Sequence, residues 1–97
     1  MPQTVFASNA VPPQLIAIAQ CESGGKQFNA DGTVVENPIT HDYGLFQIHK
    51  SWLPTAKKMG LDVINSPMDN IEFALWLSNK DPGFTDWSAS KKCWDSS

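Results

Sequence analysis

The sequence predicts a single α+β, mostly α-helical domain with at most one small hairpin. Two segments, 13–23 and 66–80, carry the start and stop signals of helices, and only residues 26–42 offer room for a small sheet. With 97 residues the chain is long enough for one hydrophobic core. We expect residues 1–12 to form a flexible N-terminal segment and residues 13–97 to form the domain.

The first predicted helix runs from Pro13 to about Ser23. Pro13 suits the first turn, where the missing N–H removes no hydrogen bond. Gly24 and Gly25 follow the last turn, and a glycine can end a helix in the left-handed conformation. The sequence therefore predicts both ends of this helix.

Glu22 is an acid on the apolar side of that helix. It shares a face with Leu15 and Ile18, which precede it at helical spacing. Apolar surroundings and the negative end of the helix dipole both disfavour the carboxylate, so both raise its pKa. A carboxyl group with a raised pKa suits general acid catalysis. The alternative is that Glu22 points to solvent at a frayed helix end.

The middle of the chain is a long, partly irregular loop followed by an apolar segment. The loop contains an Asp-Gly turn signal at Asp31, and the β-branched run 33–35 beside it is the expected place for a small hairpin. Residues 42–49 are apolar except for Asp42, Gln47 and His49. In this setting Gln47 is either a core amide bonded to the backbone or a ligand contact, and the pattern favours neither.

A short helix is expected from about Trp52 to Met59, with Gly60 just past its end. A longer helix then begins with Ser66 as the N-cap and Pro67 in the first position. Apolar residues recur along this longer helix at helical spacing, so it should be the main core helix. The residues expected on its buried face are Ile71, Ala74, Leu75 and Ser78, with Phe73, Trp76 and Leu77 beside them.

Two residues near the core helix and in the tail remain ambiguous in the sequence. Asn70, in the first turn of the core helix, is either a surface or capping amide or a contact to a ligand. Trp87 is either a core residue or part of a cleft that stacks on sugars.

Composition excludes several classes of function. A net charge of −3 without a basic run argues against nucleic acid, and no apolar run approaches the ~20 residues of a membrane span. The two histidines show no ligand spacing with the cysteines, and no glycine-rich phosphate loop is present, so we expect no metal and no cofactor. Cys21 and Cys93 either pair in an oxidising compartment or are buried free thiols.

Four groups of residues together resemble the lysozyme-like superfamily, and the resemblance is strongest to the soluble lytic transglycosylase domain. They are Cys-Glu-Ser-Gly-Gly at 21–25, Asp-Tyr-Gly-Leu-Phe-Gln-Ile at 42–48, Asn70 with Ala74, and Trp87-Ser88-x-Ser90 with Cys93-Trp94. The segment 21–25 also resembles resuscitation-promoting factors. The resemblance covers roughly residues 13–94, in the order and at spacings typical of the family.

This resemblance implies cleavage of peptidoglycan at the β-1,4 bond between N-acetylmuramic acid and N-acetylglucosamine, outside the cytoplasm. Glu22 matches the catalytic acid, Ser23 the serine that follows it, and Gln47 a glutamine that faces the substrate groove. We expect further substrate contacts from Ser23, Tyr43, Asn70 and Trp87. The resemblance to resuscitation-promoting factors also implies a disulfide between Cys21 and Cys93.

Two mechanisms follow from the resemblance. Lytic transglycosylases use a single glutamate as acid and then base, and they release 1,6-anhydro sugars without consuming water. Asp42, however, also resembles the second carboxylate of animal c-type lysozymes, which would make the chain a retaining hydrolase. The structural alternative is that Asp42 caps the turn that follows it.

Two further observations bear on this resemblance. The tyrosine that many transglycosylases carry after the last core helix is missing, and Tyr43, the only tyrosine, is the expected substitute. A non-catalytic peptidoglycan-binding module is the alternative from another class of function. We expect a monomer, or one part of a larger cell-wall or phage assembly.

Overall fold

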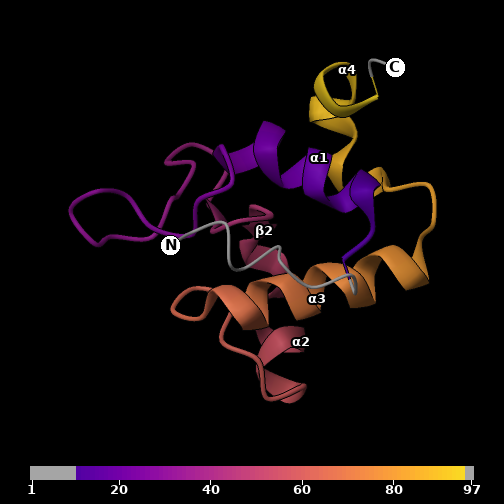
Figure 1. Cartoon of the computed structure of the whole chain (residues 1–97). Helices are drawn as coiled ribbons and strands as arrows, with labels where there is room; N and C mark the ends of the chain where they lie inside the picture. Colours follow the sequence, from indigo (N-terminus) through magenta and orange to yellow (C-terminus); the bar gives the residue numbers. More distant parts are fainter. Residues whose placement is uncertain (1–10, 96–97) are drawn as a thin grey trace.

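The structure, a computed structural model, describes residues 11–95 and is mostly helical with one small antiparallel hairpin (Figure 1). The predicted α+β, mostly helical class is therefore confirmed. In chain order the elements are α1 (Pro13–Ser23), β1 (Asp42–Tyr43), β2 (Ile48–His49), the 3₁₀ helix η2 (Lys50–Trp52), α2 (Leu53–Lys58), α3 (Pro67–Lys80), the 3₁₀ helix η3 (Thr85–Ser90) and α4 (Lys91–Trp94).

Helix α1 begins and ends where the sequence predicts. Pro13 lies in its first turn, and Gly24 ends it with φ of 70° while its N–H bonds back to the carbonyl of Gln20. Leu15 and Ile18 are fully buried in the core. Val11 is also buried, so the N-terminal segment that we expected to be flexible is anchored at this residue; residues 1–10 of that segment lie outside the described residues.

The two-stranded hairpin lies at residues 42–49, whereas the small hairpin expected beside residues 33–35 is reduced to a single antiparallel bridge. Asp42 pairs with His49 and Tyr43 with Ile48, whereas the 33–35 run contributes only an isolated bridge between Val34 and Phe28. The Asp31 carboxylate accepts hydrogen bonds from the N–H and hydroxyl of Thr33, which closes a local turn in place of a hairpin.

Two buried side-chain amides, Gln27 and Asn70, bond to the backbone of the turn between β1 and β2. Gln27 Oε1 accepts from the Leu45 N–H and Asn70 Oδ1 from the Phe46 N–H, each at 2.9 Å. The side-chain nitrogens of both amides donate to further backbone carbonyls, so neither amide is unsatisfied. Gly44 has φ of 77°, and a Cβ there would lie 2.5 Å from atoms of both amides, so glycine alone fits.

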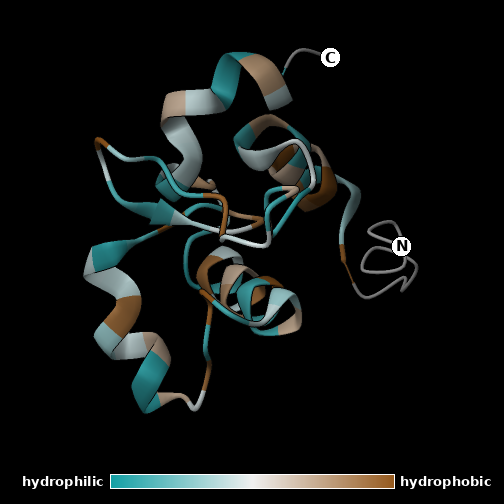
Figure 2. Ribbon diagram, turned by 90° about the vertical axis from the view of Figure 1, so that its left-hand side faces the viewer, coloured by the Kyte–Doolittle hydropathy of each residue, from teal (hydrophilic) through white to brown (hydrophobic). Residues whose placement is uncertain are grey.

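The start of α3 is confirmed, since Ser66 Oγ accepts from the Asp69 N–H at 3.1 Å. Its buried face is rotated from the predicted one, because the satisfied amide of Asn70 lies inside the core. Figure 2 shows hydrophobic and hydrophilic residues alternating along the helices, as expected of helices with one buried side. The buried residues of α3 are Asn70, Ile71, Phe73, Ala74 and Leu77. Leu75 and Ser78, which we expected on that face, are half-buried.

The hairpin lies between two groups of helices, with α1 and α4 on one side and α2 and α3 on the other (Figures 1 and 2). The implied disulfide is present: Cys21 of α1 bonds to Cys93 of α4, with their Cα atoms 6.0 Å apart. A disulfide is compatible with an extracytoplasmic location. Among the described residues, no helix has the length and apolar character needed to cross a membrane.

Candidate active site

A pocket of about 220 Å³ contains the predicted acid. We call it the Glu22 pocket. Its walls come from both groups of helices and from the hairpin between them. The lining residues are Glu22, Asp42, Gln47, Ile48, His49, Trp52, Leu77, Asp86, Trp87 and Ala89. The volume is below the roughly 300–1,000 Å³ of pockets for drug-sized ligands, so the pocket suits one part of a larger substrate.

Glu22 lies in the last turn of α1, and its carboxyl group is half-buried. Burial raises the pKa of this carboxyl above its ordinary value of 4.5. Glu22 Oε2 accepts a hydrogen bond from the Ser90 hydroxyl, which acts in the opposite direction, and the negative charge of Asp42 adds to the rise. The direction agrees with the prediction from the sequence.

Asp42 comes from β1 and lines the same pocket. Its carboxylate accepts a hydrogen bond from the Thr40 hydroxyl, so its side-chain partner precedes it in the chain and does not lie in the following turn. The pocket thus brings two carboxyl groups together, and the pKa of one of them, Glu22, is raised.

Gln47 is bonded to the backbone, as one of the two alternatives had it, and it also lines the pocket. A contact from Gln47 to a ligand stays a prediction. Its Nε2 donates to the carbonyls of Val35 and Gly44, each at 2.9 Å. Its Oε1 accepts from no donor among residues 11–95. Gln47 has φ of 48°, which is uncommon for a residue with a side chain. Such backbone conformations cluster at functional sites.

Trp87 is a core residue, as one of the two alternatives had it, and it also lines the Glu22 pocket. Only 3% of its surface is exposed, and its Nε1 donates to the Phe46 carbonyl at 2.7 Å. It packs against the Phe46 ring with 5.9 Å between ring centroids. Its remaining surface forms part of the Glu22 pocket.

Three residues that we expected to contact substrate do not line this pocket. Ser23 Oγ lies within hydrogen-bonding distance of the Leu45 carbonyl, which ties the end of α1 to the hairpin turn. Desolvation raises the pKa of Tyr43, and the charge and hydrogen bond of the neighbouring Glu36 add to the rise. Asn70 has no exposed surface, and the amide donates to and accepts from the backbone only. Ser23 and Asn70 therefore bond to the backbone of the hairpin turn and not to the pocket.

Sequence reasoning missed that Ser90 is the hydrogen-bonding partner of Glu22. It precedes Cys93 by almost one helical turn, and Glu22 is adjacent to Cys21. Once the disulfide is assumed, this arrangement brings Ser90 close to the acid. The sequence therefore indicates that Ser90 lies near Glu22, but only once Cys21 is assumed to pair with Cys93.

Several residues that do line the pocket could not be predicted from the sequence. The Trp52 indole N–H donates to Asp86 Oδ1 at 3.3 Å, a contact between residues that lie 34 positions apart. His49 reaches the pocket because β2 follows the hairpin turn. Gln27, which lies outside the pocket, was equally unforeseen, since its role depends on partners 18 and 36 residues away.

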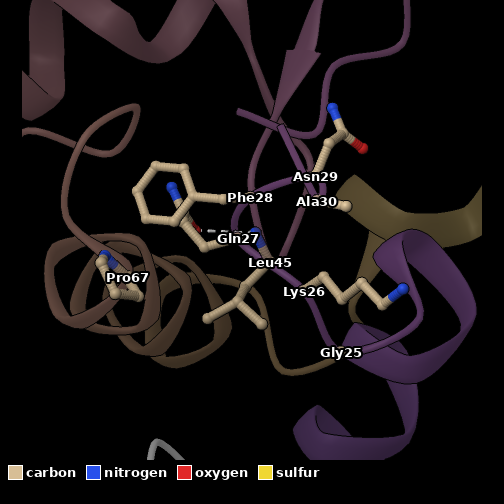
Figure 3. A pocket seen from close by; sticks show the side chains of 8 residues that line it. All are labelled: Gly25, Lys26, Gln27, Phe28, Asn29, Ala30, Leu45 and Pro67. Carbon is tan, nitrogen blue, oxygen red and sulfur yellow. Dashed lines mark hydrogen bonds between the residues drawn. The ribbon is translucent and has the colours of Figure 1, made fainter. Parts of the chain in front are cut away.

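A second pocket, of about 330 Å³, lies between residues 25–30 and the start of α3 (Figure 3). Phe28, Leu45 and Pro67 give it apolar walls, and Lys26 is its single ionisable lining residue. Without a carboxyl group it offers no general acid. The Glu22 pocket is therefore the better candidate for chemistry, although it is smaller.

The Glu22 pocket holds a carboxyl group with a raised pKa beside the carboxyl group of Asp42, and a carboxyl group with a raised pKa suits general acid catalysis. Among residues 11–95 no group of three or more His, Cys, Asp or Glu side chains is placed to hold a metal ion. Comparison of the chain with protein-family models, curated protein sequences and solved structures gave no match.

Proposed function

We propose that this chain is a lysozyme-like enzyme that cleaves peptidoglycan glycan strands at the β-1,4 bond between N-acetylmuramic acid and N-acetylglucosamine. The observation that carries the proposal is the half-buried Glu22 carboxyl, which has a raised pKa and lies in a pocket. The substrate class rests on the resemblance of residues 21–25 and 42–48 to lytic transglycosylases. The disulfide supports a location in the cell envelope or outside it.

In the proposed reaction Glu22 acts twice. Its proton passes to the glycosidic oxygen as the bond from that oxygen to the anomeric carbon of N-acetylmuramic acid breaks. The carbonyl oxygen of the sugar's own N-acetyl group stabilises the positive charge on that carbon. The Glu22 carboxylate then takes the proton of the 6-hydroxyl as this oxygen bonds to the anomeric carbon. The product is a 1,6-anhydro sugar, and Glu22 is protonated again.

The Gln47 amide suits a role in binding the sugar. Because its nitrogen is held by the carbonyls of Val35 and Gly44, its oxygen is a fixed acceptor for a sugar hydroxyl or an acetamido N–H. The buried indole of Trp87 forms part of the wall of the Glu22 pocket. In this proposal both residues orient the substrate, and neither exchanges a proton with it.

A retaining hydrolase is the second candidate, favoured by one observation: Asp42 lines the same pocket as Glu22 and influences its pKa. In that case Asp42 would bond to, or stabilise, the anomeric carbon, and water would complete the reaction with Glu22 as the base.

Mass spectrometry of the fragments released from purified peptidoglycan tests these proposals. Fragments with 1,6-anhydro ends support the transglycosylase, and fragments with reducing ends support the hydrolase. Glu22→Gln should abolish release, whereas Glu72→Gln, at an exposed position on α3, should leave it unchanged. Cleavage by Glu22→Gln at the parent rate would refute the assignment. Binding of cell wall without any release by the parent chain would indicate a binding module.

Asp42→Asn distinguishes the two mechanisms. A hydrolase needs the Asp42 carboxylate, so its rate should fall by orders of magnitude, as for other removed catalytic groups. A transglycosylase that relies on the substrate's N-acetyl group should keep most of its rate and release the same anhydro products.

A further inference from the structure

We infer that Ser90 is a positioning residue for Glu22: its hydroxyl holds one oxygen of the carboxyl group and thereby directs the transferable proton to the other oxygen. This inference rests on the proposed role of Glu22 as the catalytic acid. It gives η3 and α4, the last two elements that the structure describes, a direct part in proton transfer by Glu22 of α1.

The hydrogen bonds around Ser90 fix the direction of its hydroxyl. Trp94 Nε1 lies 3.0 Å from Ser90 Oγ and donates to it. The single hydroxyl hydrogen of Ser90 then has two acceptors in reach, Glu22 Oε2 and the Trp87 carbonyl, the latter at 3.2 Å. A carboxylate is the stronger acceptor because the bond is charge-assisted. The hydroxyl therefore donates to Glu22 whenever that group is ionised.

This donation determines which carboxyl oxygen carries the proton during catalysis. Because Oε2 of Glu22 accepts from Ser90, the proton is favoured on Oε1. Oε1 has no hydrogen-bonding partner among residues 11–95, which leaves it free to act on a substrate in the Glu22 pocket. Without Ser90 the carboxyl group could rotate and could carry its proton on either oxygen. Correct orientation of an acid contributes directly to the rate.

The same bond balances the acidity of Glu22. Burial and the charge of Asp42 raise the pKa of the carboxyl, and the Ser90 hydroxyl lowers it. Asp42 from β1, His49 from β2 and Asp86 from η3 are the other ionisable groups that line the pocket. A general acid works best with a pKa near the working pH, so a partner that limits the rise is useful.

The position of Ser90 is held by more than its own hydrogen bonds. Cys21 is adjacent to Glu22, and Cys93 lies one turn beyond Ser90, so the disulfide ties the two segments together beside the carboxyl. The side-chain amide of Gln14 in α1 also donates to the Trp94 carbonyl, at 3.2 Å.

The test compares Ser90→Ala and Ser90→Thr with the matched control Ser88→Ala, whose side chain is exposed on η3. Rates of fragment release are measured over a range of pH, with kcat and KM determined on soluble glycan strands. We expect Ser90→Ala to lower kcat by about tenfold or more, the equivalent of one hydrogen bond to a charged group, while KM stays close to that of the parent. Ser90→Thr should restore most of kcat, and Ser88→Ala should behave as the parent.

The pH profile gives the readout that a purely structural role would not move. The acid must be protonated, so activity falls as pH rises through the pKa of Glu22. Losing the Ser90 donor raises that pKa, so the alkaline limb of Ser90→Ala should move to higher pH. An unchanged limb and an unchanged kcat would overturn the inference, as would an equal loss in Ser88→Ala.

Direct titration keeps this test separate from the proposed function. The carboxyl carbon of Glu22 is followed by NMR in the parent and in Ser90→Ala, with no substrate present. A higher midpoint in the variant supports the inference even if the parent releases no fragments, and an equal midpoint refutes it even if the parent is an active enzyme. If Ser90→Ala does not fold, Ser90→Gly replaces it, because Ser90 is the N-cap of α4, where glycine is tolerated, and the change also removes the hydroxyl donor.

Discussion

Removal of the Cys21–Cys93 disulfide should cost this domain much of its stability. The bond joins residues 72 positions apart in a chain of 97. A cross-link reduces the conformational entropy of the unfolded chain, and the reduction grows with the logarithm of the loop length. For a loop of this length the chain-entropy relation gives about 4 kcal/mol at 25 °C.

That value is large compared with the whole stability of such a domain. A chain of this size is expected to unfold with a free energy of roughly 5–15 kcal/mol. Because each kcal/mol shifts the melting temperature of a domain of this size by about 4–8 °C, the reduced protein should melt roughly 15–30 °C lower.

Urea titration of three samples measures the effect: the oxidised parent, the parent with reductant, and the double variant Cys21→Ala and Cys93→Ala. The two samples without the cross-link should agree with each other, because both lack the same constraint. The Cys93 side chain is exposed and that of Cys21 is half-buried, so truncating them adds only a modest packing loss. A loss below about 1 kcal/mol in both samples would refute the reasoning, since it would mean that the unfolded chain gains no freedom.

Two further predictions concern single side chains. Asn70→Ala should lower the free energy of unfolding by about 2–4 kcal/mol, because it leaves the buried Phe46 N–H without a partner; Asn79→Ala, exposed on the same helix, should change it by less than about 0.5 kcal/mol. Glu22→Gln should be more stable than the parent at neutral pH. The folded-state pKa of Glu22 is raised, so its stability contribution is complete below the unfolded pKa and is lost as pH rises through the folded pKa. Melting temperatures should therefore differ more at about pH 7 than at about pH 3.5, and the reverse trend would contradict a buried Glu22.

The helix ends could be predicted from the sequence because the signals that set them are local. Pro13, Gly24, Gly60, Ser66 and Pro67 each act within a few residues of their own position. Proline fixes φ in the first turn, serine bonds to a nearby N–H, and glycine adopts a positive φ at low cost. None of these effects needs a distant partner, so each can be predicted from the local sequence alone.

The hairpin was misplaced because its position depends on distant contacts. Residues 33–35 have the better intrinsic preference for a strand. Residues 42–49 form the hairpin because Gln27 and Asn70, from two other parts of the chain, bond to the backbone of its turn. A buried amide looks the same in sequence as an exposed one. The same ambiguity made Asn70 a predicted substrate contact and left Gln27 unnoticed.

The site was predicted in part. Glu22, Asp42, Gln47 and Trp87 line one pocket in the structure, although they come from three different segments, namely α1, the hairpin and η3. Their roles in catalysis remain predictions. Tyr43, the neighbour of Asp42 on β1, does not line the pocket, because neighbours on a strand point to opposite faces. The neighbours of Gln47 and Trp87, by contrast, include Ile48 and Asp86, which do line it.

The two ends of the described chain depend on one another at the site. Helix α1 supplies the acid, but on its own it would leave Glu22 at an exposed helix end, the ordinary state that the sequence offered as an alternative. Ser90 and Trp87 come from residues 85–95, and they give the carboxyl its partner and a wall of its pocket. The disulfide from Cys93 to Cys21 ties this segment to α1 beside the carboxyl. A local opening of this C-terminal segment would return the pKa of Glu22 towards its ordinary value, because it would reduce the burial of the carboxyl. It would also break the bond from Trp87 to the Phe46 carbonyl, so the hairpin turn would be held by Gln27 and Asn70 alone.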